Sequence, residues 1–237
     1  MRAAFDRGLS VGYGAVYGLR NLTVAVLLTT GAAHAETVTI AALGDSLTAG
    51  YGLRQGDGFV PQLQSWLDAQ GADVTLINAG VSGDTTAGGL SRVTWTLTPE
   101  VDAMIVALGG NDYLRGLDPA VSRANLDGIL AEGEAAGVDV LLVGLKSGSN
   151  YGPDYKSEFD QMYGDLAAKY GVSVYADFFD GVRMAAGTQA GIADYMQADG
   201  IHPNAQGVAV IVAAIGPRVL QLVTDAQDGL AQAVGLD

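Results

Sequence analysis

Two side chains near the end of the chain have the types and spacing needed to activate a nucleophile. His202 lies three residues after Asp199, and Gly200 between them allows a tight turn. An aspartate that accepts a hydrogen bond from one ring nitrogen fixes the tautomer, so that the other nitrogen can take a proton from a hydroxyl group. A surface or helix-capping histidine gives the same pattern. The pair alone therefore leaves a catalytic and a structural interpretation open.

Ser46 is the hydroxyl that such a histidine could serve. It lies in the sequence Gly44-Asp45-Ser46-Leu47, directly after an apolar run. A serine between a buried strand and a helix can point its own backbone N–H at an anion. The position also suits an ordinary helix N-cap, and Asp45 before it suits either a supporting role or a turn. Together with the Asp-His pair, the serine indicates nucleophilic catalysis on an acyl group.

Hydrolysis of an ester also requires donors that stabilise the developing oxyanion, each worth about 10²–10³ in rate. The sequence offers the backbone N–H of Ser46, the backbone N–H of Gly80 and the side-chain amide of Asn111. Gly80 carries no side chain that would block close approach, and Asn111 follows two glycines. Glycine and asparagine are also ordinary turn residues. The prediction therefore depends on the four motifs occurring together, each in a loop at the end of a predicted strand or before the last helix.

The elements that must position these loops follow from five short apolar runs, which predict buried strands. They are Val38 to Leu43, Asp73 to Ile77, Ala103 to Leu108, Asp139 to Val143 and Val172 to Ala176. Segments with helical periodicity lie between them, and the last helix is expected to begin after an N-cap at Asn204. This alternation predicts an α/β fold: a three-layer α/β/α sandwich with a parallel sheet of about five strands. Ligands bind beyond the carboxyl ends of such strands, where the loops named above would meet.

The first residues have the pattern of an export signal. Arginines precede an apolar run from Leu22 to Leu28, and Ala33-His34-Ala35 fits an A-x-A cleavage site. We expect a signal peptide over residues 1–35 and a single domain over 36–237, located in the periplasm or secreted. Cleavage would leave His202 as the only imidazole. The apolar run is shorter than the ~20 residues of a membrane span, and no later stretch is expected to qualify.

Composition excludes several other functions. The formal net charge is −14, and removing three arginines and one aspartate with the leader would make it −16. Such a surface repels nucleic acid. The chain has no cysteine, which excludes disulfides and a cysteine nucleophile. No residues show metal-ligand spacing or a phosphate-binding Gly-rich motif followed by lysine. We therefore expect a monomer without metal or cofactor, acting on a small-molecule ester or thioester.

Five motifs in order make the sequence resemble the G-D-S-L, or S-G-N-H, hydrolase superfamily. The motifs are Gly44 to Gly52, Asn78 to Thr85, Gly109 to Gly116, Asn150 to Gly152, and Asp199 to Asn204. The match is nearest to bacterial periplasmic enzymes described as esterase, thioesterase, arylesterase and lysophospholipase. The four named positions of the superfamily correspond to Ser46, Gly80, Asn111 and His202.

The resemblance implies a flavodoxin-like sandwich and metal-independent hydrolysis of esters, thioesters or lysophospholipids through an acyl-serine intermediate. Ser46, Gly80 and Asn111 would form the oxyanion hole, with Asp199 and His202 completing the catalytic set. The chain departs from such relatives in the polar segment Lys146 to Ser149 and in an insert, Ala185 to Ala193. Two alternatives are a carbohydrate O-acetyl esterase of the same superfamily and a non-catalytic binding module.

Overall fold

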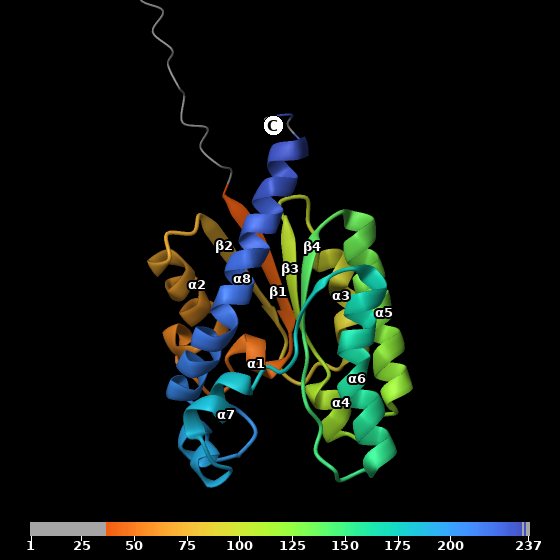
Figure 1. Ribbon diagram of the computed structural model, residues 1–237, viewed down its shortest axis with the longest axis vertical. Coiled ribbons are helices and arrows are strands. Elements are labelled where there is room, and N and C mark those ends of the chain that lie inside the picture. Colours follow the sequence, from red (N-terminus) through yellow and green to blue (C-terminus); the bar gives the residue numbers. More distant parts are fainter. Residues whose placement is uncertain (1–36, 234, 236–237) are drawn as a thin grey trace, which may run out of the picture. The chain divides into compact units, whose positions relative to one another are not determined.

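The computed structural model describes residues 37–233 and 235, and the predicted signal peptide lies outside them. The described part contains one sheet of five parallel strands in the order β2-β1-β3-β4-β5 (Figure 1). The strands are β1 (Val38–Gly44), β2 (Val74–Gly80), β3 (Ala103–Ala107), β4 (Asp139–Val143) and β5 (Ser173–Tyr175). The predicted fold class and the five predicted strands are confirmed.

Helices cover both faces of the sheet, as a parallel sheet requires. One layer contains α2 (Phe59–Ala69) and α8 (Ala205–Ala233), with α7 (Asp180–Ala186) packed on α8. The opposite layer contains α3 (Thr86–Thr96), α5 (Pro119–Ala136) and α6 (Pro153–Tyr170). The short helices α1 (Ser46–Ala49) and α4 (Gly110–Leu114) begin just beyond the carboxyl ends of β1 and β3. The described residues also form two short 3-10 helices, η1 (Gln55–Asp57) and η2 (Ala190–Tyr195).

The strands β1, β2 and β3 end at the same level of the sheet. All residues of β3, and all but one in each of β1 and β4, are buried, whereas β2 at the edge is largely exposed. In this register Gly44 pairs with Gly80 on one side and with Ala107 on the other. The loops that follow β1, β2 and β3 therefore leave the sheet at one level.

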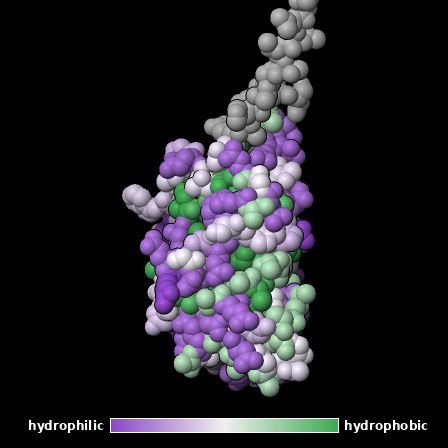
Figure 2. Space-filling view, turned by 90° about the vertical axis from the view of Figure 1, so that its left-hand side faces the viewer, coloured by the Kyte–Doolittle hydropathy of each residue, from purple (hydrophilic) through white to green (hydrophobic). Residues whose placement is uncertain are grey.

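The face seen from the side of α2 is mixed in character (Figure 2). Hydrophilic residues cover most of it, and the hydrophobic residues between them lie in separate areas.

The last helix, α8, begins where the sequence predicts. The Asn204 side-chain oxygen accepts from the Gly207 N–H at 2.9 Å, which confirms Asn204 as the N-cap. The expectation that no stretch after the leader has the composition of a membrane span is wrong, because Ala205–Gln232 passes that test on length and hydropathy. Half of the most apolar stretch is buried, and the helix contacts α2, α7 and four strands. The apolar character of α8 therefore serves the core of the described domain.

The contact between α8 and α2 generates a paired test. A methyl group at Gly216 of α8 would lie 2.8 Å from ring atoms of Trp66 of α2, whereas one at Gly164 of α6 meets no atom within 4 Å. Both glycines lie inside helices, so alanine brings each the same gain in helix propensity, about 0.5–1 kcal/mol. We expect Gly164→Ala to raise the free energy of unfolding by that amount and Gly216→Ala to lower it by about 1–3 kcal/mol. Urea unfolding measures both, and equal effects would contradict the packing argument.

Candidate functional site

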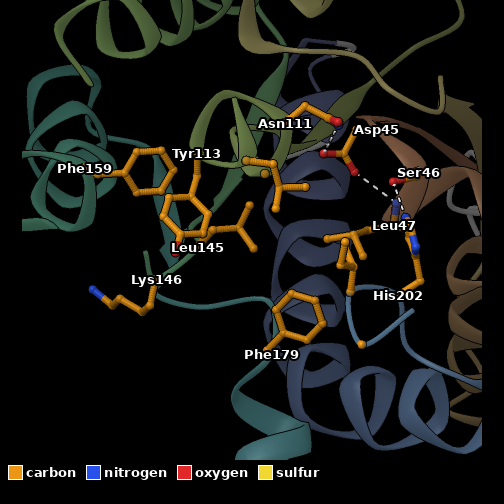
Figure 3. Close-up of a pocket in the computed structure, with 14 residues that line it drawn as sticks. Asp45, Ser46, Leu47, Asn111, Tyr113, Leu145, Lys146, Phe159, Phe179 and His202 are labelled. Carbon is orange, nitrogen blue, oxygen red and sulfur yellow. Dashed lines mark hydrogen bonds between the residues drawn. The ribbon is translucent and has the colours of Figure 1, made fainter. Parts of the chain in front are cut away.

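The structure brings Ser46, His202 and Asp199 together at the carboxyl edge of the sheet. His202 Nε2 lies 2.8 Å from Ser46 Oγ (Figure 3). His202 Nδ1 lies 2.7 Å from Asp199 Oδ2. An ionised carboxylate can only accept, so Nδ1 carries the proton and Nε2 is free to accept from the serine hydroxyl. The three residues thus form a chain of hydrogen bonds that can move a proton from Ser46 to the imidazole.

The tight turn from Asp199 to His202 holds the imidazole in this orientation. Asp199 Oδ1 accepts from the N–H groups of Ile201 at 2.9 Å and His202 at 3.0 Å, and Gly200 adopts a φ of 67° that favours glycine. The hydrogen bonds from the His202 backbone and side chain, and then from Ile201, lower the pKa of Asp199 to about 2. Asp199 is therefore ionised at every pH at which an imidazole can act as a base.

Two residues that the sequence reasoning missed support the His202 loop. Gln197 Nε2 donates to the carbonyl groups of Tyr51 at 2.8 Å and Pro203 at 3.0 Å. The ring of Tyr51 lies against that of His202, with 4.6 Å between the centroids. Tyr51 follows directly from the Ser46 helix, so these contacts connect the two loops that carry Ser46 and His202. No local pattern marks Gln197, because its partner beside the serine helix, Tyr51, lies 146 residues away in the sequence.

Asp45 is a buried carboxylate beside the serine. Only 2% of the residue is exposed. Its Oδ1 accepts from the Leu47 N–H at 3.0 Å, which makes it the N-cap of α1, and its Oδ2 accepts from Asn111 Nδ2 at 3.3 Å. Burial raises the pKa of Asp45 from 3.8 to about 6, against the opposing effects of Leu47, Asn111 and His202. Asp45 therefore both begins the helix and holds the Asn111 amide.

The structure places Asn111 in the pocket but not Gly80. Asn111 lines the same pocket as Ser46 and His202, whereas Gly80 is absent from that lining. The Gly80 N–H donates to Asn78 Oδ1 at 3.0 Å, and a Cβ at Gly80 would lie 2.4 Å from the Ala49 backbone nitrogen. Gly80 thus allows β2 to pack closely against α1, and its expected role as an oxyanion donor does not fit this geometry. Gly83, further along the same loop, has a φ of 87°.

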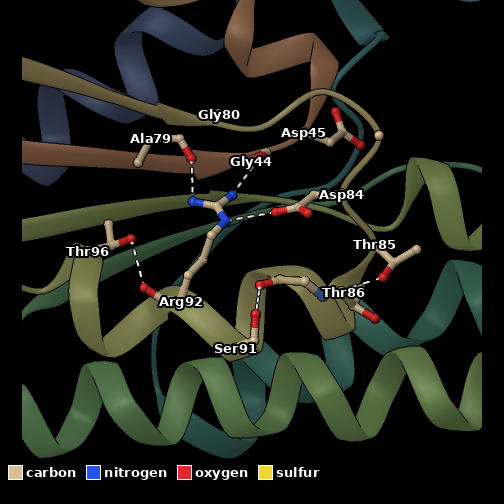
Figure 4. Close-up of polar contacts among 12 residues, drawn as sticks. Gly44, Asp45, Ala79, Gly80, Asp84, Thr85, Thr86, Ser91, Arg92 and Thr96 are labelled. Atoms are coloured by element: carbon tan, nitrogen blue, oxygen red, sulfur yellow. Dashed lines mark hydrogen bonds and ion pairs between the residues drawn. The ribbon is translucent and has the colours of Figure 1, made fainter.

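Arg92 of α3 fixes the strand ends behind the serine (Figure 4). Its Nη2 donates to the Gly44 carbonyl at 2.8 Å and its Nη1 to the Ala79 carbonyl at 2.7 Å, while its Nε pairs with Asp84 at 2.7 Å. One guanidinium group therefore connects the end of β1, the end of β2 and the loop that follows. The fixed fork of arginine donors suits this arrangement.

The loop after β3 is attached to the same region by polar contacts. Asp112 is fully buried and accepts from Thr86 N at 2.8 Å, Thr86 Oγ1 at 2.6 Å and Ser122 Oγ at 3.0 Å. Arg115 instead donates to the Gly83 carbonyl at 2.7 Å. Asp112 and Arg115, three residues apart, therefore have different partners.

The pocket beside Ser46 is mainly apolar, with a volume of about 210 Å³. Its far wall consists of side chains from α4, α6 and the loops after β4 and β5, namely Tyr113, Leu114, Leu145, Lys146, Phe159 and Phe179. Of the polar segment from Lys146 to Ser149, only Lys146 lines the pocket, whereas Ser147 N and Oγ both donate to Asp160 Oδ1 of α6. Among the described residues no group of three or more His, Cys, Asp or Glu side chains could hold a metal ion.

The family model and the relatives that match this chain agree on one family. Residues 42–210 match the GDSL-like Lipase/Acylhydrolase family. The chain is 39% identical to "Esterase TesA" of Pseudomonas aeruginosa over 84% of this chain and 92% of the relative. It is 36% identical to "Thioesterase 1/protease 1/lysophospholipase L1" of Escherichia coli K12 over 76% of this chain and 81% of that protein.

Solved structures agree with these sequence matches. The crystal structure of AlinE4, described as an SGNH-hydrolase family esterase, is 42% identical with a TM-score of 0.63 and covers 78% of this chain and 96% of its own. The psychrotrophic esterase EstA from Pseudoalteromonas is 31% identical with a TM-score of 0.64, over 82% of this chain and 98% of its own.

The buried carboxylate generates a pH test. Because the pKa of Asp45 in the folded protein, about 6, lies above its ordinary value of 3.8, the folded state binds this proton more tightly than the unfolded state. The contribution of Asp45 to stability therefore falls as pH rises from about 4 to 6. We expect Asp45→Asn, which keeps an N-cap acceptor, to gain up to about 3 kcal/mol relative to wild type over that range. Urea unfolding of both proteins at pH 4, 5, 6 and 7 measures the difference, and a difference independent of pH would contradict this assignment.

Proposed function

This chain belongs to the GDSL-like lipase/acylhydrolase family and is a serine hydrolase that cleaves ester bonds. We propose that Ser46 is its nucleophile, that His202 is the general base, and that Asp199 orients His202. The observation that carries this proposal is the 2.8 Å contact between His202 Nε2 and Ser46 Oγ. The alternatives of a carbohydrate O-acetyl esterase and a binding module are less consistent with the named relatives.

The reaction takes place in two steps. His202 Nε2 takes the Ser46 proton as Oγ attacks the carbonyl carbon, and the imidazolium then gives this proton to the leaving oxygen or sulfur as its bond to carbon breaks. Water repeats the sequence on the acyl-serine and releases the acid. The ionised Asp199 stabilises the imidazolium in both steps without taking up the proton itself.

The oxyanion is stabilised by the Ser46 N–H and the Asn111 side-chain amide. The Ser46 N–H lies in the first turn of α1, where helix geometry provides no acceptor. The acceptor at Asp45 keeps the Asn111 amide beside the serine. For a third donor we propose the Gly83 N–H in place of Gly80, since Gly80 donates to Asn78 and Gly83 lies in the same loop after β2.

The apolar pocket fits the acyl chain of a carboxylic ester, an acyl thioester or a lysophospholipid. We also propose that the protein acts as a monomer, because one copy of the chain contains the hydrogen-bonded set of Ser46, His202 and Asp199. No cofactor or metal enters the proposed steps.

We also propose that residues 1–35 are cleaved and that residues 36–237 act in the periplasm or outside the cell, on the evidence of the arginines, the apolar run and the A-x-A site.

Substitutions test the roles of the site residues. Ser46→Ala and His202→Ala remove the nucleophile and the base, so each is expected to lower kcat for p-nitrophenyl butyrate by about 10³-fold or more. Asn111→Ala removes one oxyanion donor and is expected to lower kcat by about 10²–10³ with a smaller change in KM. Steady-state kinetics measures all three, and near-normal turnover by Ser46→Ala would refute the assignment.

A fluorophosphonate probe separates an enzyme from a binding module. The probe should label wild-type protein on Ser46, identified by peptide mass spectrometry, and should not label Ser46→Ala. Dialysis against EDTA serves as a control for metal dependence and should leave the rate unchanged. Absence of labelling in folded wild-type protein would favour a binding module.

A further inference from the structure

A second, mainly apolar chamber lies beside the pocket that contains Ser46. It has a volume of about 200 Å³ and is lined by Phe179, Val182, Arg183, Ile192, Met196, Gly200 and Ile201. Three of these residues, Phe179, Gly200 and Ile201, also line the pocket beside Ser46. The two chambers therefore share a wall immediately before His202.

The lining of the second chamber suits an uncharged apolar group. Val182, Ile192, Met196 and Ile201 supply aliphatic and thioether surface, and methionine adapts readily to different shapes. Arg183 is the single charged residue in the lining, and its guanidinium group is paired with Asp177. A cavity of about 150 Å³ is large enough to hold benzene, so this chamber has room for one aromatic ring or a short alkyl chain.

The positions of His202, which acts as the general acid, and of the oxyanion donor Asn111 determine which part of a substrate each chamber faces. His202 Nε2 must reach the leaving oxygen or sulfur to protonate it, and Gly200 and Ile201 of the second chamber directly precede His202. Asn111 lies with Tyr113 in the other chamber. In Figure 3 Ser46 and His202 lie at one end of the first pocket, Tyr113 and Phe159 at the other, and Phe179 between them.

We propose that the second chamber binds the apolar alcohol or thiol part of the substrate, while the pocket lined by Tyr113 and Phe159 binds the acyl part. The preferred substrates are then esters that are apolar on both sides of the carbonyl, such as aryl or benzyl esters of short acids. The turn η2 supplies Ile192 from the region of the insert, so the insert acts as a specificity element. This inference rests on the proposed function.

Two series of esters test separately how each chamber contributes to substrate preference. The first keeps the acetyl group and varies the alcohol from methanol to benzyl alcohol, and the second keeps the methyl group and varies the acid from acetate to hexanoate. Ile192 lines only the second chamber, and Leu114 lines only the first. We expect Ile192→Trp to lower the kcat/KM ratio of benzyl acetate to methyl acetate by about tenfold and to leave the ratio of methyl hexanoate to methyl acetate unchanged.

Two control variants show whether the effect of Ile192→Trp is specific to the second chamber. Leu114→Trp should produce the reverse pattern, and Val121→Trp, at an exposed position on α5 outside both linings, should keep both ratios. If Ile192→Trp does not fold, Ile192→Ala enlarges the chamber and should shift preference from benzyl acetate toward 2-naphthylmethyl acetate. Equal changes in both series, or no change in the benzyl series for either Ile192 variant, would overturn the proposal.

The failure of this inference can be distinguished from failure of the proposed function. Fluorophosphonate labelling of Ser46 in the Ile192 variants shows that the nucleophile is intact, whatever the ester preference. If Ser46→Ala keeps activity or wild type resists the probe, the proposed function fails. If labelling is normal and the alcohol series is unaffected, only the assignment of the second chamber fails.

Discussion

The hydrogen bond between His202 and Ser46 joins two loops that are 156 residues apart in the sequence, and the proposed chemistry depends on keeping them in contact. Neither loop can do this alone. The serine loop is fixed by β1 and by the Asp45 cap of α1, whereas the histidine loop is fixed by its Asp199 turn and by α8. Gln197 and Tyr51 connect the two loops directly.

Buried and half-buried polar groups set the relative positions of the loops. Arg92 connects the ends of β1 and β2, Asp112 connects α3 with the loop after β3, and Asp45 holds Asn111. The raised pKa of Asp45 shows that burying this charge is unfavourable. Such groups are best understood as devices that select one arrangement of loops, since fully satisfied polar networks give a site a unique geometry.

The sequence was sufficient to predict the fold and those site residues that lie close together within one motif. The strands and α8 were predictable because burial leaves an apolar pattern, and Asp199 with His202 because the turn that joins them is local. Arg92 and Gln197 were not predictable, since their partners lie 6 to 146 residues away and contribute only backbone carbonyls or a carboxylate in a loop. The hydrogen bond from the Gly80 N–H to Asn78 does not support the role expected for Gly80, for a related reason. A glycine that permits packing against α1 and a glycine that donates to an oxyanion look alike in a sequence.

The position of α8 at the end of the described domain has a consequence for synthesis and turnover of the protein. Until residues 205 to 233 are present, α2 and the sheet lack the helix that covers them, and the loop with His202 lacks the element that follows its Asn204 cap. A chain truncated before this helix exposes a large apolar surface and has no completed active centre. Hydrolytic activity is therefore a property of the finished polypeptide, and incomplete products are both inert and recognisable to proteases that degrade unfolded chains.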